Sequence, residues 1–232
     1  MIDLHIHSLF SDGKDSPEDI VKTAIAIGLQ EVALCEHVRY DTRWFPDYLA
    51  EVQRLKKMYG KDIIIYSAVE AKVVDFAGNI DVRPEFFAVD IIYAVVHRIP
   101  MGEGKFCSGR EDPGVLKRNW LFCLSAVNLR NAHVTALAHP FLPAIQYGLD
   151  VQSVDIENLI ETIADSKKAV EINLKYKHPA DEHFLGLLAG KVPFLISSDS
   201  HSIQEMQERK QELENAWKKW GKFWAPGCLW YL

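Results

Sequence analysis

Three side chains of the kind that bind divalent metal ions stand within the first twelve residues. His5 and His7 are two residues apart in an apolar run, and the two-residue period of a β-strand would place both imidazoles on one face. Asp12 follows in a Ser-Asp-Gly turn that can fold its carboxylate back toward them. Imidazole and carboxylate ligands suit zinc, iron or manganese, so this segment predicts part of a metal site.

Further side chains of these types follow five later apolar runs, at 31–35, 62–69, 91–96, 134–138 and 193–197. They are His37, Glu70, His97, His139 and the spaced pair Asp199 and His201. Together with the first three they make nine ligand groups, too many for one ion and suited to a cluster of two or three. Burying so many ionisable groups without metal would be costly, because desolvation and mutual repulsion add up.

The apolar runs alternate with segments of helical periodicity. Helices are expected at 16–28, 46–59, 112–127, 154–166, 181–189 and 203–222. Alternating strands and helices predict an α/β fold with a parallel sheet, and seven strands close more naturally into a barrel than they lie open. Parallel barrels carry their functional side chains at the C-terminal ends of the strands, where six of the seven predicted strands have a His, Glu or Asp. The seventh, 169–173, ends in Asn173, with Lys175 just beyond.

Length and charge narrow the classes of function. A chain of 232 residues with 48% hydrophobic side chains predicts one domain over residues 1–232. A net charge of −6 argues against a nucleic-acid or anionic-membrane partner and favours a small-molecule substrate. No apolar run approaches the roughly 20 residues that span a bilayer, and the chain starts directly with strand and site residues, so we expect a cytoplasmic protein. The four cysteines lack metal-site spacing and are expected to be reduced thiols.

Two segments interrupt the alternation, and a third ends the chain. Residues 71–86 are expected to form a small hairpin, and the glycine-rich stretch 102–113 a long loop that covers the site. Three tryptophans, 217, 220 and 224, have helical spacing and are expected to pack on the barrel. With residues 230–232 they leave an apolar tail that could dock on a second subunit, which makes a homo-oligomer a further expectation. The remaining histidines, His133, His178 and His183, are expected to be structural or exposed.

Taken in order, the metal-ligand motifs resemble those of the PHP (polymerase and histidinol phosphatase) phosphoesterases. The matching segments are His5-x-His7 with Ser11-Asp12-Gly13, Glu36-His37, Glu70, Val96-His97, Ala138-His139-Pro140 and Ser198-Asp199-Ser200-His201. The resemblance implies a distorted, TIM-like (β/α)7 barrel with a metal site at the C-terminal ends of its strands. It also implies two or three divalent ions (Zn, Mn or Fe) and the hydrolysis of phosphoesters. Glu36 departs from the family, which more often has Asp there.

The same resemblance implies how the ligands are shared. One ion would be held by four side chains: His5, His7, Glu70 and Asp199. A second ion would share Glu70 and be held by His97 and His139. A third would be held by Asp12, His37 and His201.

Such a cluster needs no protein nucleophile, because the cations lower the pKa of a water molecule and polarise the phosphate oxygens. Glu70, Asp199 and His201 are the predicted catalytic residues, with Asp199 or His201 relaying a proton to the leaving alkoxide. Phosphate oxygens that are not bound to metal should meet cations just beyond the strand ends. The candidates for substrate binding are Arg39, Arg98 and Lys175.

The leading hypothesis is therefore a metal-dependent phosphatase that acts on a small phosphorylated metabolite, such as histidinol phosphate. A nuclease, a nucleotide phosphodiesterase or a protein-tyrosine phosphatase could use the same site. A hydrolase of C–N bonds is a weaker rival, because that chemistry usually needs a carboxylated lysine or a two-metal set, and no lysine replaces Glu70. A non-catalytic metal-binding module is the alternative of another class; its relatives would be expected to lack ligands, whereas all nine positions are filled here.

Overall fold

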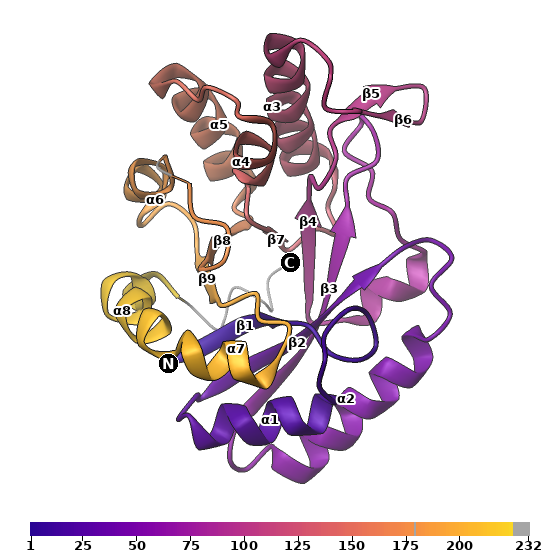
Figure 1. Ribbon diagram of the computed structural model, residues 1–232, viewed down its shortest axis with the longest axis vertical. Coiled ribbons are helices and arrows are strands. Elements are labelled where there is room, and N and C mark those ends of the chain that lie inside the picture. The colour runs from indigo at the N-terminus through magenta and orange to yellow at the C-terminus, as the bar shows by residue number, and fades with distance from the viewer. Residues whose placement is uncertain (179, 225–232) are drawn as a thin grey trace.

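Seven parallel strands form one continuous sheet in a computed structural model that describes residues 1–178 and 180–224. Their order is β1-β2-β3-β4-β7-β8-β9 (Figure 1). The bounds are β1 (Ile2–Ile6), β2 (Glu31–Val38), β3 (Ile64–Lys72), β4 (Ile91–Val95), β7 (Ala136–Leu137), β8 (Ala169–Asn173) and β9 (Phe194–Ser197). Just beyond β9, the carbonyl of Ser200 accepts a hydrogen bond of 3.0 Å from the backbone N–H of His7. The sheet is thus nearly closed, and the predicted α/β barrel of seven parallel strands is confirmed.

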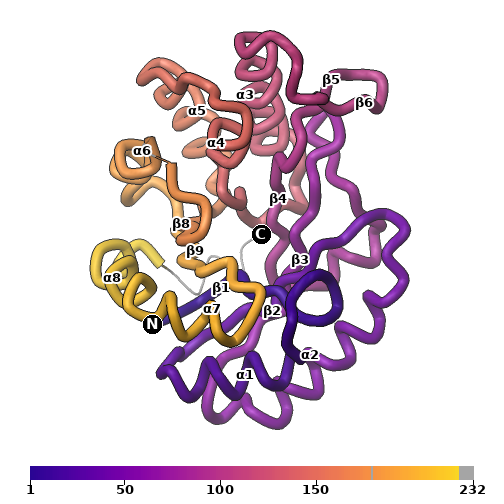
Figure 2. The backbone as a smooth tube through the Cα atoms, in the orientation of Figure 1, coloured from indigo at the N-terminus to yellow at the C-terminus, as the bar shows by residue number. Residues whose placement is uncertain are grey.

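Helices surround this barrel (Figure 2). They are α1 (Pro17–Ala26), α2 (Phe45–Tyr59), α3 (Pro113–Arg130), α4 (Leu142–Tyr147), α5 (Ser153–Ser166), α6 (Asp181–Leu188), α7 (Ile203–Glu208), α8 (Lys210–Trp220) and the short 3-10 helices η1 (Pro84–Ala88) and η2 (Gly221–Phe223). The starts of α1 and α3 follow local chemistry. Ser16 and Asp112 each accept the backbone N–H three residues on, and a proline occupies the first helical position.

Three segments differ from the sequence-based expectation. The helix expected at 203–222 is two helices, α7 and α8, which meet at Arg209. The six-residue helix α4 was not expected, because it is too short to show a helical period. The expected loop at 102–113 begins with a short hairpin, β5 (Pro100–Gly102) and β6 (Lys105–Phe106). Residues 71–86 do turn back as expected, through an antiparallel bridge between Val73 and Ile80, before η1.

The barrel strands are buried on both faces. Every residue of β1, β4 and β8 is buried, which explains why β4 is an uninterrupted apolar run, whereas β1 and β8 also bury polar side chains. Tyr93, fully buried on β4, donates a 2.9 Å hydrogen bond to the carbonyl of Leu4 and so ties opposite parts of the barrel together. A polar residue inside these runs is therefore surrounded by the core, and its partners decide whether it is stable there.

The C-terminal tryptophans pack on the outside of the barrel. Trp217, Trp220 and Trp224 pack, partly buried, against the core as expected, and Trp220 lies 5.6 Å from the ring of Phe194. Cys35, Cys107 and Cys123 are free and buried. The fourth cysteine, Cys228, and the apolar tail at 230–232 lie outside the described residues. Across 1–178 and 180–224, the helices are all too short or too polar to cross a membrane.

Candidate metal centre

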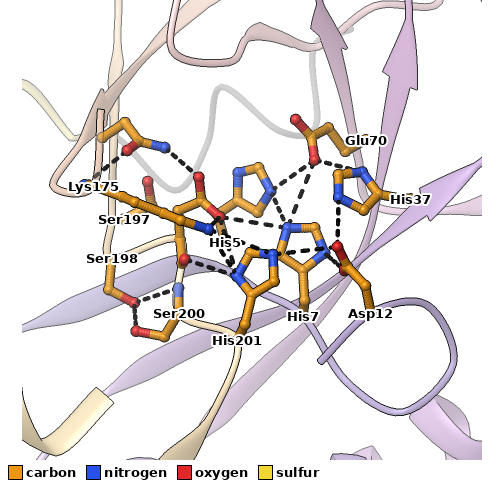
Figure 3. A network of polar contacts seen from close by, with 12 residues as sticks. His5, His7, Asp12, His37, Glu70, Lys175, Ser197, Ser198, Ser200 and His201 are labelled. Carbon is orange, nitrogen blue, oxygen red and sulfur yellow. Dashed lines mark hydrogen bonds and ion pairs between the residues drawn. The ribbon is translucent and has the colours of Figure 1, made fainter. Parts of the chain in front are cut away.

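The nine predicted ligands lie together at the C-terminal ends of the strands, and six of them are labelled in Figure 3. Contacts of 2.8–3.6 Å between imidazole nitrogens and carboxylate oxygens join all nine into one network. The parallel register makes this possible, because His37 on β2 is paired directly with Glu70 on β3. Strand ends that are distant in sequence thus form one rim.

The carboxylate of Glu70 is the centre of this network. Its Oε1 lies 2.8 Å from Nε2 of His139 and 3.1 Å from Nε2 of His97, and its Oε2 lies 2.9 Å from Nδ1 of His37. Nε2 of His5 and His7 are 3.5 and 3.6 Å from Oε2. Burial alone would raise the pKa of Glu70, but the surrounding imidazoles, His37 foremost, hold it well below its usual value. The carboxylate is therefore ionised, as a metal ligand must be.

The loop that carries Asp12 is folded over His7. Oxygens of the Asp12 carboxylate lie 3.4–3.6 Å from nitrogens of His7, His37 and His201. The loop is held by Glu36, whose buried carboxylate accepts hydrogen bonds from the Ser8 backbone N–H at 3.1 Å and from the hydroxyls of Ser8 and Ser11. These hydrogen bonds to Glu36 thus orient the Asp12 loop.

Gly13 is required by the close approach of this loop to β1. A Cβ at position 13 would lie 2.2 Å from the carbonyl oxygen of His7. Gly13→Ala should therefore displace the loop, lower the free energy of unfolding by about 1–3 kcal/mol and weaken metal binding at Asp12. Urea unfolding and metal content test this. The control is Gly186→Ala on α6, where a new Cβ meets nothing within 4 Å; equal stability loss in both variants would contradict the prediction.

Two of the predicted ligands have strained backbones. His139 and Asp199 have φ angles of 25° and 52°, a region that non-glycine residues rarely adopt. Each is held there by a buried partner. The His139 N–H donates to Oε2 of Glu171 at 2.7 Å, and the Asn173 side-chain amide donates to Oδ2 of Asp199 at 3.1 Å. Such strain is characteristic of functional sites, where the surrounding structure fixes an unfavourable geometry.

Three groups of ligand atoms are close enough to share an ion, each within 4.8 Å of one another. They are His7, Asp12, His37 and His201; His5, His7 and Asp199; and His37, Glu70 and His97. The first two resemble the sites implied by the family likeness. The third differs, because His37 joins Glu70 and His97 in the place expected for His139.

The donor set fits divalent cations. Within residues 1–178 and 180–224, Nδ1 of His7 and Nδ1 of His139 are buried without a hydrogen-bond partner. Nε2 of His5 and Nε2 of His7 face each other at 3.0 Å, with carboxylates around them. Here buried imidazole nitrogens face one another and also face ionised carboxylates. A cation shared between them would satisfy the lone pairs of all these groups.

The charges of the histidines depend on their neighbours. Burial opposes a charge on His37, but Glu70 and Asp12 outweigh it and raise its pKa to about 10. Burial lowers the pKa of His7 to about 4, against its hydrogen bond with Asp199. At neutral pH, His7 is therefore a neutral ligand, whereas His37 carries a proton in the metal-free protein.

Metal binding should consequently release a proton from His37. When zinc is titrated into metal-free protein at pH 7.5, we expect release of at least one proton per chain, because a ligating imidazole must be neutral and the pKa values of His5 and His139 are raised as well as that of His37. Calorimetric titrations in buffers with different ionisation enthalpies measure this number. Binding heats that do not depend on the buffer would show that His37 is already neutral and would contradict the prediction.

Glu171 belongs to the site and was missed by the sequence analysis. It lies inside β8, fully surrounded, and its Oε1 is 2.7 Å from Nδ1 of His5 and 2.5 Å from the Ser197 hydroxyl. A carboxylate that binds the far nitrogen of a ligating histidine fixes its tautomer, so that Nε2 of His5 faces the centre. The available signal was an acidic residue within an apolar strand, two positions before Asn173 and hence on the same face.

The predicted substrate-binding cations occupy two places. Nζ of Lys175 lies 3.1 Å from Nδ1 of His201 and 3.5 Å from Oδ1 of Asp199, at the ligands themselves. Arg39 and Arg98 instead line a cavity of about 630 Å³. The same cavity is lined by four of the nine ligands, which are Asp12, His37, Glu70 and His97.

The chain belongs to the PHP domain family, whose sequence pattern matches residues 3–223. It is 25% identical over 231 residues to the DNA polymerase/3'-5' exonuclease PolX of Bacillus subtilis, an alignment that covers 94% of this chain but only 37% of PolX. It is 26% identical over 229 residues to the histidinol-phosphatase of Lactococcus lactis, covering 86% of this chain and 84% of that enzyme.

Two crystal structures support the fold. The putative histidinol phosphatase of Listeria monocytogenes matches with a TM-score of 0.72 and 16% identity, over 91% of this chain and 99% of that one. The histidinol phosphate phosphatase of Lactococcus lactis, complexed with zinc, L-histidinol and phosphate, matches with a TM-score of 0.64 and 21% identity, over 91% of this chain and 93% of that one. At these identities the likeness establishes the barrel.

Proposed function

We propose that this chain is a metal-dependent phosphatase that hydrolyses the phosphate monoester of a small metabolite. The observation that carries the proposal is the network of six imidazoles and three carboxylates centred on Glu70, four of which line the cavity of about 630 Å³. Membership of the PHP family and the histidinol-phosphatase relative support it. PolX alone would suggest nuclease activity, but the net charge of −6 does not favour a nucleic-acid substrate.

Two or three divalent ions (Zn, Mn or Fe) would be held by the nine ligands. When bound, such ions supply a water of lowered pKa and polarise the phosphate oxygens. The chain's own residues do the rest. Glu171 and Glu36 hold His5 and the Asp12 loop in place, which keeps the ligands oriented before substrate arrives.

Lys175 and its neighbours would act on the substrate directly. The ammonium of Lys175 stands beside Asp199 and His201, where it can bind a phosphate oxygen and offset the charge that develops on it. Asp199 or His201 would pass a proton to the departing alkoxide, since both stand at the edge of the ligand set next to Lys175. No residue of the chain needs to become covalently attached to phosphate.

The test is phosphate release by purified protein of measured metal content. Histidinol phosphate, phosphotyrosine and single-stranded DNA are assayed side by side, because they represent the monoesterase, protein phosphatase and nuclease alternatives. We expect release from a small monoester, loss of activity on chelation, and its return on addition of zinc or manganese. A fully metal-occupied protein that hydrolyses none of a broad phosphoester panel would instead be a non-catalytic metal-binding module.

A further inference from the structure

The cavity above the candidate metal centre has a cationic wall that the phosphate does not account for. Beyond the ligands, its lining includes Arg39, Lys72 and Arg98, with Asp81 as the one opposing acid among the described lining residues. Lys175, the cation beside Asp199 and His201, does not line this cavity. The scissile phosphate would therefore have the ions and Lys175 as partners, while three further cations face the space above it.

Two of these cations are held in position by the β5–β6 hairpin, which lies beyond the ends of β3 and β4 (Figure 1). Nζ of Lys72 lies 4.3 Å, and the guanidinium carbon of Arg98 lies 6.0 Å, from the centre of the Phe106 ring. Arg98 also donates a 2.8 Å hydrogen bond to the carbonyl of Cys107. These contacts fix the side chains without neutralising them, because an aromatic ring and a carbonyl carry no net charge.

The acid at this wall leaves most of the charge uncompensated. Oδ2 of Asp81 is 3.9 Å from Nζ of Lys72, at the limit of an ion pair, and its Oδ1 accepts the Tyr40 backbone N–H at 3.1 Å. The Arg39 side chain forms no ion pair with any residue of 1–178 or 180–224. Three cations against one carboxylate leave an excess of two positive charges among these four residues, of which Arg39 and Arg98 are exposed and Lys72 is half-buried.

We infer that Arg39, Lys72 and Arg98 form a subsite for a second anionic group, a phosphate or carboxylate, on the leaving group of the substrate. This inference rests on the proposed function and narrows its substrate class. A forked guanidinium and an ammonium together match the oxygens of such a group. Phosphomonoesters with a second anion should be preferred over those with a neutral leaving group, and over histidinol phosphate, whose leaving group carries an ammonium.

Matched substrates test the preference. For the metal-loaded protein, we expect kcat/KM to be at least about tenfold higher for fructose 1,6-bisphosphate than for fructose 6-phosphate, and likewise for 3-phosphoglycerate over glycerol 3-phosphate. The two pairs distinguish a phosphate from a carboxylate as the second anion. In Lys72→Met and Arg98→Met, the kcat/KM ratio of each pair that shows the preference should fall to within about twofold of one. Lys57→Met, an exposed residue of α2 outside this cavity, is the control and should keep the wild-type ratio.

A binding measurement separates this inference from the proposed function. The phosphonates 6-phosphonohexanoate and hexylphosphonate cannot be hydrolysed and differ only in a terminal carboxylate. Calorimetry should give a Kd about tenfold lower for the first, and Arg98→Met should abolish the difference. Equal affinities together with equal turnover of both substrate pairs would overturn the subsite. Absence of any phosphoester turnover would instead overturn the proposed function, whereas the phosphonate difference would still show the subsite.

Discussion

Replacing Glu70 by glutamine is expected to remove bound metal and phosphoester hydrolysis together. The carboxylate contacts five imidazoles, and an amide of the same shape loses the negative charge and turns one oxygen into a hydrogen-bond donor. Without bound metal, the transition state loses several kcal/mol of stabilisation, which corresponds to a decrease in kcat of about 10³-fold. Metal content should fall by at least one ion per chain, as measured by elemental analysis of the same samples used for phosphate release.

The matched control for this change is Glu161→Gln, an exposed glutamate on α5. It makes the same chemical substitution without touching the site and should keep wild-type metal content and kcat. Circular dichroism establishes that both variants are folded. A Glu70→Gln protein that keeps its full metal content and its turnover would show that the network around Glu70 is not the catalytic centre.

Replacing Glu171 by glutamine is expected to weaken metal binding about 10–100-fold, because it removes the carboxylate that orients His5. The amide of glutamine can donate a hydrogen bond to Nδ1 of His5. It would then favour the tautomer in which Nε2 of His5 carries the proton, and a protonated Nε2 cannot bind a metal ion. Activity should fall at limiting metal and recover in part at saturating metal. Competition with a chromophoric chelator measures the affinity, and activity against added zinc measures the recovery.

Glu171→Asp is the control that separates a specific effect on metal binding from a general effect on folding. The shorter carboxylate keeps the charge and should retain more metal affinity than Glu171→Gln, although both shorten or alter the contacts to Ser197 and the His139 N–H. Unfolding by urea shows whether the two variants lose stability equally. Metal affinity that is unchanged in Glu171→Gln would mean that Glu171 supports the strand ends only as a buried structural group.

Most of the fold and the nine candidate ligands follow from local sequence patterns. Apolar runs alternating with helical periods define a parallel barrel, and parallel strands bring their C-terminal ends to one rim. His37 and Glu70 therefore had to be neighbours once their strands were known, and the register pairs them directly. The helix expected at 203–222 is instead two helices that meet at Arg209, because the apolar side chains keep their helical spacing on both sides of the break.

What the sequence analysis missed has a common physical cause. Periodicity records which side chains are buried, but it does not record which polar atoms meet inside the core. Glu171 lies within a strand, not at its end. Its role in the site depends on its contact with His5, which is 166 positions away in the sequence. Lys72 was placed in an excursion from the barrel, whereas β3 extends through it and carries it to the cavity. The grouping of His37 with Glu70 and His97 likewise depends on three-dimensional geometry.

The most direct test is a crystal structure of zinc- or manganese-loaded protein with anomalous diffraction recorded at the absorption edge of the metal. We expect two or three anomalous peaks at the C-terminal ends of the strands, ligated by the nine side chains and with Glu70 between two of them. Fully loaded protein whose anomalous peaks lie elsewhere, with these histidines and acids coordinating nothing, would contradict this expectation.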